Sequence, residues 1–338
     1  MNVEHPWPRV AVVVPCYKVA ASIESVVASI PPEVWRIYCV NDSSPDDSRS
    51  VIERLAEQDN RVRLVDRSEN GGVGAAFMTG VAAALADKAH VIVKLDGDGQ
   101  MNGSFVTDFA APILTGEADY VKGNRFYDVE HVLAMPRARL IGNAGLSFLS
   151  KLSTGYWNLF DPTNGFVAIH AEVARLIPAS KVHPRYFFES DLLFRLSVLR
   201  ARVVELPMET IYKDELSGLN EWRCLLTFPL LHARNFFKRI FYNYLLRNFS
   251  LGSITLPLGM LMLSFGSLYG LVRWIESYES QEPATAGTVM LSALPIIIGI
   301  QLMLNFLAQD VSSVPDRAVH KRLTHKRTLV SAERELEG

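Results

Sequence analysis

Residues 90–100 read HVIVKLDGDGQ and are the most informative segment for the fold of this chain. Its first half is a run of apolar and β-branched residues, the composition of a buried strand, and its second half is a polar turn that carries Asp96 and Asp98. In open α/β sheets, ligands bind outside the carboxyl ends of the strands. The segment therefore predicts a strand of an α/β sheet and, directly after it, a binding site.

Segments of the same composition recur along the first 220 residues. The other expected strands are VAVVVP at 10–15, WRIYCV at 35–40, RVRLV at 61–65 and ADYVKG at 118–123. Helical patterns lie around residues 20–30, 46–59 and 74–87. Strands that alternate with helices in this way predict an α/β fold with a mostly parallel sheet covered on both faces.

Three polar clusters follow the expected strands and should meet at one edge of the sheet. They are Pro15-Cys16-Tyr17, Asn41-Asp42-Ser43-Ser44 and Asp96-Gly97-Asp98-Gly99-Gln100. Two carboxylates separated by one glycine can face one point, and hard oxygen ligands suit Mg²⁺ or Mn²⁺. A metal there would neutralise a diphosphate. The alternative is a pair of solvated turn residues, and the position after a buried strand favours the metal site.

A glycine-rich stretch, Asn70 to Ala75, follows the third expected strand and opens a helix. Glycines allow close approach of a ligand, and a helix N-terminus favours anions. A dinucleotide-binding fingerprint is the alternative, but that motif belongs after the first strand of a βαβ unit. The placement argues against it.

The bulk composition excludes several classes of protein. A net charge of −2 and a pI near 6.5 provide no basic field for nucleic acid. Cys16, Cys39 and Cys224 lack both even pairing and metal-ligand spacing, so we interpret them as packing residues in a reducing compartment. The first residues carry no apolar run typical of a cleavable signal peptide, so the N-terminal part is expected in the cytosol.

Two long uncharged stretches mark a change of environment after about residue 250. They run from Phe249 to Val272 and from Pro283 to Gln309, and each is long enough to cross a hydrocarbon core of about 30 Å. They predict a transmembrane hairpin over 249–310, with helices at about 249–272 and 284–309. The alternative is a buried core hairpin of a soluble protein.

Charge and amphipathicity around these stretches indicate an orientation. Basic residues precede the first stretch and follow the second, which places both ends in the cytoplasm. Residues 222–248 mix aromatic and basic side chains and predict amphipathic helices on the membrane surface, or alternatively a helix packed on the globular domain. The expected organisation is thus a catalytic domain at 1–221, juxtamembrane helices at 222–248, the hairpin, and a cytoplasmic tail at 311–338.

The chain carries a series of short motifs in the order VVVPCY, VNDSSPD, ENGGVGAA, KLDGDGQ, KGNRF, RLIGN, FDPTNGF and YFFESD. Together with the paired apolar stretches, this series resembles the family 2 glycosyltransferases, and within them the polyprenyl-phosphate sugar transferases such as dolichol-phosphate mannose synthase and bactoprenol glucosyltransferases. The resemblance covers nearly the whole chain.

The resemblance implies a glycosyltransferase A fold and a divalent metal, Mg²⁺ or Mn²⁺, that bridges the acidic motif and the donor diphosphate. Asp98 and Gln100 would hold the metal, with Asp96 nearer the ribose or in the metal shell. The residues that would line the nucleotide pocket are Pro15, Tyr17 and Asp42. The metal would withdraw charge from the departing nucleotide.

On the acceptor side, the resemblance implies that Arg125 and Arg139 bind a lipid phosphate, because a guanidinium grips phosphate with two hydrogen bonds. Surface salt bridges are the alternative for both. Asn143, four residues beyond Arg139, would share its helical face and assist.

Three acidic residues are further candidates by resemblance. Asp161 would face the sugar, either as a base or in orienting the acceptor, since an ionised lipid phosphate is itself the nucleophile. Glu189 and Asp191 would lie near the donor sugar, with helix capping or structural pairing as the alternative for Asp191.

The chain departs from the family pattern at two places. Lys213-Asp214-Glu215 stands where many relatives carry an arginine that closes over the diphosphate. Lys18 and Val19 replace the more usual Asn-Glu after the first strand. Nucleotide contacts at these positions cannot be transferred from the family.

The function expected from these features is transfer of one sugar from a nucleoside-diphosphate sugar to polyprenyl phosphate, with inversion, at the bacterial inner membrane. The expected partners are the nucleotide-sugar, the lipid, the membrane and further copies of the chain. A UDP-hexose is favoured over GDP-mannose. The alternatives are a processive polysaccharide synthase, against which the missing Gln-x-x-Arg-Trp motif argues, and a non-catalytic partner of a flippase.

Overall fold

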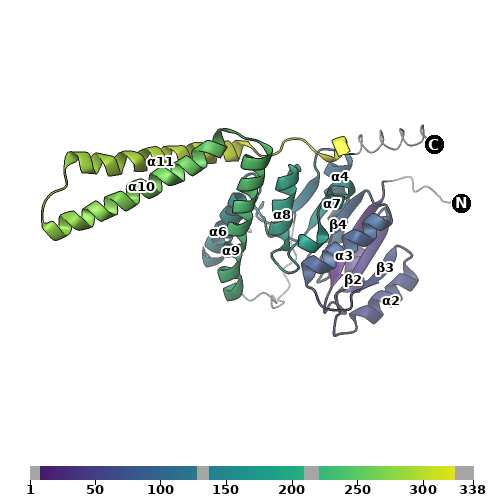
Figure 1. Ribbon diagram of the computed structural model, residues 1–338. Coiled ribbons are helices and arrows are strands. Elements are labelled where there is room, and N and C mark those ends of the chain that lie inside the picture. The colour runs from purple at the N-terminus through teal and green to yellow at the C-terminus, as the bar shows by residue number, and fades with distance from the viewer. Residues whose placement is uncertain (1–7, 128–136, 209–220, 324–338) are drawn as a thin grey trace. The chain divides into compact units, whose positions relative to one another are not determined.

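The computed structural model describes residues 8–127, 137–208 and 221–323 (Figure 1). The chain packs as two compact units, Met1–Asn235 together with Pro315–Gly338, and Phe236–Val314. Each unit is described by itself below.

The first unit is built on a seven-stranded sheet with the order β3-β2-β1-β4-β6-β5-β7. Most neighbouring strands are parallel, and β6 runs antiparallel to both β4 and β5. The strands are β1 (Val10–Cys16), β2 (Arg36–Asn41), β3 (Val62–Asp66), β4 (Val91–Lys94), β5 (Tyr120–Asn124), β6 (Val167–His170) and β7 (Val203–Pro207). The mostly parallel α/β sheet expected from the sequence is thus confirmed, with β6 and β7 added to the five expected strands.

Helices cover both faces of this sheet (Figure 1). They are α1 (Ile23–Ser29), α2 (Ser48–Gln58), α3 (Val73–Ala86), α4 (Val106–Leu114), α6 (Arg137–Thr154), α7 (Ala171–Arg175) and α8 (Phe188–Leu199), with short 3-10 turns η1 (Gly103–Phe105) and η2 (Ala179–Lys181). On one face Val12 and Val14 belong to the same core cluster as Ile52 and Phe109. On the other face α3 packs closely, because a Cβ on Gly80 would lie 2.3 Å from the Val13 side chain.

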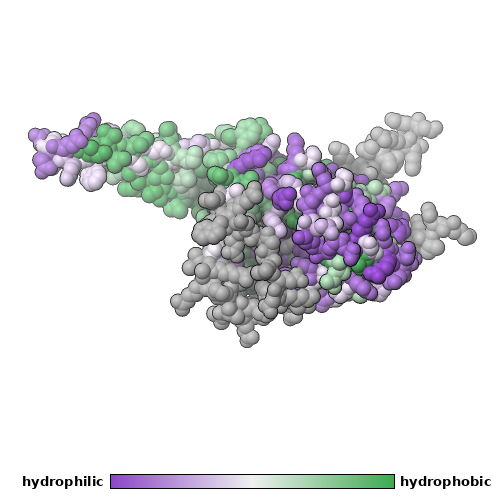
Figure 2. All heavy atoms as spheres, turned by 90° about the horizontal axis from the view of Figure 1, so that it is seen from below, coloured by the Kyte–Doolittle hydropathy of each residue, from purple (hydrophilic) through white to green (hydrophobic). Residues whose placement is uncertain are grey.

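The second unit contains two long apolar helices, α10 (Leu251–Ser280) and α11 (Ala286–Ser312). Glycines let the two backbones approach: a Cβ on Gly266 would lie 2.7 Å from the Ser292 carbonyl oxygen. Large apolar side chains such as Leu261 and Ile297 remain exposed, and Figure 2 shows this part of the chain as mostly hydrophobic. Both helices are long and apolar enough to cross a membrane. This outward apolar surface is unlike that of the buried core hairpin considered as the alternative.

An ion pair lies in the second unit, beside the C-terminal end of α11. Arg239, near the end of α9 (Glu221–Ile240), donates to both carboxylate oxygens of Asp310 at 2.6 and 2.9 Å. Tyr244, in the π-helical segment Phe241–Arg247 (η3), donates to the same carboxylate at 2.6 Å. Both charged side chains are almost fully buried, and the bidentate geometry supplies the pairing that such burial requires.

The beginning of the tail packs on the first unit. The backbone N–H groups of Val319 and His320 donate to the buried Asp119 carboxylate at 2.8 and 2.9 Å. The His320 ring stacks on His170 with centroids 4.1 Å apart. The charged composition of the tail did not indicate this attachment, because its partner lies 201 residues earlier in the sequence.

Candidate active site

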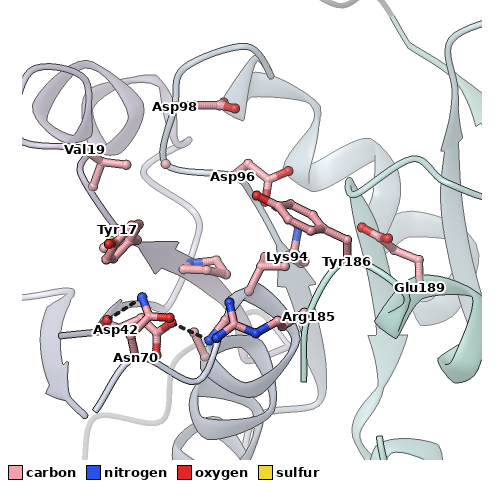
Figure 3. Close-up of a pocket in the computed structure, with 16 residues that line it drawn as sticks. Tyr17, Val19, Asp42, Asn70, Lys94, Asp96, Asp98, Arg185, Tyr186 and Glu189 are labelled. Atoms are coloured by element: carbon pink, nitrogen blue, oxygen red, sulfur yellow. Dashed lines mark hydrogen bonds and ion pairs between the residues drawn. The ribbon is translucent and has the colours of Figure 1, made fainter. Parts of the chain in front are cut away.

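A cavity of about 400 Å³ opens at the carboxyl ends of β1, β2 and β4. Its size lies within the range of small-molecule sites. Figure 3 shows the side chains around it. The lining residues are Pro15, Cys16, Tyr17, Val19, Asp42, Asn70, Gly72, Val73, Ala76, Lys94, Asp96, Gly97, Asp98, Arg185, Tyr186 and Glu189.

The acidic motif after β4 faces this cavity. Asp96 and Asp98 are both partly exposed lining residues. One Asp98 oxygen accepts from the Gln100 backbone N–H at 3.0 Å, and one Asp96 oxygen accepts from the Lys94 ammonium. Gln100 is not among the lining residues, so its expected role as a metal ligand remains a prediction.

The carboxylate oxygens of Asp96 and Asp98 suit a hard divalent cation. Two carboxylates bordering one cavity provide oxygen ligands of the kind that Mg²⁺ and Mn²⁺ prefer. Across residues 8–127, 137–208 and 221–323, no group of three or more His, Cys, Asp or Glu side chains is placed so that it could hold a metal ion. An ion bound between Asp96 and Asp98 would therefore take its other ligands from substrate and water.

Asp42 lines the same cavity, but the protein already uses its carboxylate. One oxygen accepts from the Gly71 N–H at 3.0 Å and from Arg67 Nε at 2.8 Å, and the other accepts from the Gly72 N–H at 2.7 Å. The glycine-rich turn before α3 thus binds an anion, and that anion is the Asp42 side chain. Whether Asp42 also contacts a nucleotide stays a prediction.

Pro15 and Tyr17, both expected in the nucleotide pocket, lie on its wall. The Tyr17 ring is 46% exposed. An aromatic ring exposed on a pocket wall presents a flat apolar face on which a planar base can stack.

The lining residues also include Arg185 and Tyr186, neither of which was among the expected site residues. They precede α8 and reach the cavity because this segment packs on the turn before α3. A Cβ on Gly72, whose φ is +91°, would lie 2.8 Å from Arg185 Cγ and 2.9 Å from the Pro184 carbonyl oxygen. Nothing local in the sequence signals this contact, which depends on segments more than 100 residues apart.

The two acidic candidates of α8, Glu189 and Asp191, lie in different surroundings. Glu189 lines the cavity, where burial raises its pKa to about 7, although the charges of Lys94 and Lys122 act in the opposite direction. Asp191 is not among the lining residues. Its carboxylate accepts from the His183 N–H at 3.0 Å, from Arg195 at 2.9 Å and from Asn235 at 3.2 Å. These contacts favour the structural pairing that the sequence left open for Asp191.

Arg125 and Asp161 form an ion pair, and neither residue is among those that line the cavity. Arg125 follows β5 and donates through Nε and Nη2 to the two Asp161 oxygens at 2.8 and 3.0 Å. Asp161 is fully buried. Burial acts to raise the pKa of Asp161, but the hydrogen bonds and charge of Arg125, together with the charge of Lys122, bring it below its usual value. The carboxylate is therefore ionised at neutral pH and pairs with the arginine.

The remaining expected residues lie at the edge of the described chain. The backbone of α6 includes Arg139 and Asn143, and the Asn143 side chain is half-buried. The Arg139 side chain and the segment Lys213-Asp214-Glu215 lie outside the described residues. Their expected roles stay predictions.

Comparison with known proteins assigns the family. Residues 11–177 match the sequence profile of glycosyl transferase family 2. UDP-N-acetylglucosamine–dolichyl-phosphate N-acetylglucosaminyltransferase of Methanococcus voltae is 26% identical over 60% of this chain and 85% of its own. Undecaprenyl-phosphate mannosyltransferase of Micrococcus luteus is 26% identical over 61% and 85%. Polyprenol monophosphomannose synthase of Mycolicibacterium smegmatis is 29% identical over 64% and 83%.

Solved structures show the same fold. Glucosyl-3-phosphoglycerate synthase from Mycobacterium tuberculosis, in complex with Mn²⁺, UDP and glucosyl-3-phosphoglycerate, superimposes with a TM-score of 0.51. The two are 21% identical, and the match covers 69% of this chain and 80% of that one. The glycosyltransferase A fold expected from the sequence is confirmed. The chain therefore contains a family 2 glycosyltransferase domain, with polyprenyl-phosphate glycosyltransferases among its relatives.

Proposed function

We propose that this enzyme transfers one sugar from a nucleoside-diphosphate sugar to a polyprenyl phosphate. The observation that carries the proposal is the cavity that Asp96 and Asp98 line at the carboxyl end of β4. The relatives that act on dolichyl, undecaprenyl and polyprenol phosphates support a lipid-phosphate acceptor.

The donor would bind in the cavity. Asp96 and Asp98 would hold Mg²⁺ or Mn²⁺, with Gln100 as a further ligand, and the metal would neutralise the leaving nucleotide diphosphate. Arg185 lines the same cavity and would supply a cation for the phosphates. The exposed Tyr17 ring would stack on the base, beside Pro15 and Asp42.

We favour a UDP-hexose as donor, because the solved neighbour holds UDP with Mn²⁺. GDP-mannose is the second candidate, because two of the relatives are named as mannosyl transferases. Glu189 would contact the sugar, since it shares the cavity with Asp96.

The acceptor phosphate would bind at Arg125, with help from Arg139 and Asn143. Burial raises the pKa of the lining residue Glu189 and the charge of Arg125 acts in the opposite direction, so Arg125 lies within electrostatic reach of the cavity. An ionised lipid phosphate needs no base and would attack the anomeric carbon in line, which inverts it. Asp161, ionised and paired, would act by orienting Arg125 rather than by accepting a proton.

The second unit would anchor the enzyme in the membrane. We propose that α10 and α11 span the bilayer and that residues 222–248 form juxtamembrane helices on its surface. The catalytic domain, 1–221, and the tail, 311–338, would lie in the cytoplasm at a bacterial inner membrane. The thin anchor of two helices favours a homo-oligomer.

The proposal is tested with the purified full chain in detergent, given undecaprenyl phosphate, Mg²⁺ or Mn²⁺ and a panel of UDP- and GDP-sugars. The expected result is a lipid that carries one sugar, formed from one donor and lost when the metal is chelated. A polymeric product would favour the processive synthase. Nucleotide binding without any lipid product would favour the non-catalytic partner, and either result would overturn the proposal.

A further inference from the structure

Two buried lysines flank one residue of the sheet. Lys94 is the last residue of β4, and Lys122 lies in β5; both are paired in register with Val167 of β6, from opposite sides. Residues in register on neighbouring strands point to the same face of a sheet. Here that face is covered by α8, because the Lys94 ammonium lies 5.3 Å from the centre of the Phe188 ring. Lys94 is 1% exposed and Lys122 is fully buried.

Both lysines bind the loop that leads into β6. Lys94 Nζ donates to the Gly165 carbonyl oxygen at 3.1 Å, and Lys122 Nζ donates to the carbonyl oxygen of the preceding residue, Asn164. The other end of the loop is held from β7, where Glu205 accepts from the Phe160 and Asp161 N–H groups at 2.8 Å. Charged side chains from three strands therefore fix residues 160–165.

This loop lies between the donor carboxylates and the acceptor-side pair. Lys94 also donates to Asp96 in the cavity, and a Cβ on Gly165 would lie 2.7 Å from Asp96 Oδ2 and 2.8 Å from Lys94 Nζ. At its other end the loop carries Asp161, which binds Arg125. Figure 3 shows Lys94 beside Asp96, with Glu189 on the neighbouring wall. The same short loop thus contacts groups on both sides of the site.

A purely structural explanation accounts poorly for the choice of lysine. Buried carbonyl groups need donors, but backbone N–H groups or neutral amides satisfy them without burying a charge. The other residues of β4 are Val91, Ile92 and Val93, so the strand is otherwise apolar. Removing an ammonium group from water is costly, and a buried ion pair is weak evidence for stability. Retaining two such charges next to Asp96 and Asp161 indicates a role in the site.

We propose that Lys94 and Lys122 are positioning residues of the transfer reaction. Lys94 fixes the Asp96 carboxylate for the metal and the donor, and Lys122 fixes the loop that presents Asp161 and Arg125 to the acceptor phosphate. The inference rests on the proposed function. It assigns each buried charge to one substrate, and the two assignments can be separated by measurement.

The test uses the full chain in nanodiscs and the variants Lys94→Met and Lys122→Met, with Lys181→Met, at an exposed surface position, as the matched control. UDP binding with saturating Mn²⁺ is measured by calorimetry, and KM values for donor and acceptor are measured separately. Lys94→Met should weaken UDP binding and raise the donor KM by about tenfold or more, the usual effect of removing a group that orients a metal-binding carboxylate. Lys122→Met should raise the acceptor KM and leave UDP binding unchanged.

Gly165→Ala covers the case in which a lysine variant does not fold. It keeps both lysines, but its Cβ displaces Lys94 or Asp96, so it should reproduce the donor-selective defect. The proposal is overturned if folded variants keep wild-type constants, or if both lysine variants change donor and acceptor constants equally. Loss of thermal stability with unchanged constants also overturns it. If the wild type makes no glycolipid, the proposed function fails, while the UDP titration of Lys94→Met still tests the donor half.

Discussion

The two halves of the catalytic sheet treat charge differently. At the ends of β1, β2 and β4, Asp96 and Asp98 border an open cavity. In the β6, β5 and β7 half, charged groups are bound to protein partners, as in the pair of the partly buried Arg125 and the fully buried Asp161. Under the proposed function, the first half would receive a cation and a diphosphate and is called the donor half. The second half would be the acceptor half, where a phosphate that arrives at Arg125 would compete with Asp161 for the same N–H groups.

The largest effect should come from the donor half. Asp98→Ala should lower turnover by at least about 100-fold, because a bound metal contributes several kcal/mol of charge stabilisation in the transition state. The measurement is the rate of glycolipid formation over a range of Mn²⁺ concentrations. Asp108→Ala, at an exposed position of α4, is the matched control and should behave as wild type. Equal rates for the two variants would remove Asp98 from the metal site.

A smaller and more selective effect should follow from Arg125→Ala. We expect the acceptor KM to rise about 10- to 100-fold, the scale of hydrogen bonds to a charged group, with UDP binding unchanged. Arg125→Lys should recover only part of this loss, since an ammonium cannot donate in the bidentate geometry seen with Asp161. Arg175→Ala, at an exposed position, serves as control. A rise in the donor KM instead of the acceptor KM would assign Arg125 to donor binding.

The donor half also contains a charge bound by the protein, the Asp42 carboxylate. Asp42→Ala should destabilise the fold by about 1–3 kcal/mol, because two backbone N–H groups and Arg67 lose their acceptor. Thermal unfolding in the absence of nucleotide measures this loss, and Asp42→Asn should lose less. Unchanged stability with weakened UDP binding would instead assign Asp42 to the nucleotide alone.

The last effect is a pH dependence due to Glu189. Its pKa is raised from 4.5 to about 7 in the folded protein, so the folded state binds more protons than the unfolded state between these values. Stability from this group is present below about pH 4.5 and is lost as the pH rises through about 7. Glu189→Gln should therefore lose less thermal stability than the wild type between pH 5 and pH 8. Parallel curves for the two proteins would contradict the raised pKa.

Each half could be predicted from the sequence only where its contacts join residues that are close together in the chain. Asp96 and Asp98 were found because a buried strand and a polar turn are neighbours in sequence. Arg125 and Asp161 were both singled out by resemblance, but their pairing was not. Arg185 was missed altogether, because it reaches the cavity only by packing of its segment against Gly72.

By itself the sequence determined the alternation of strands and helices, the acidic turn after β4 and the two long apolar helices. These features depend on local periodicity and composition, which the chain carries wherever it packs. Other features required the packed molecule: Asp42 occupies the glycine-rich turn, Asp191 accepts from Asn235, and Lys94 and Lys122 lie on either side of Val167. The physical reason is that charge pairing and sheet register join segments far apart in the chain: Lys94 and Gly165 are separated by 71 residues.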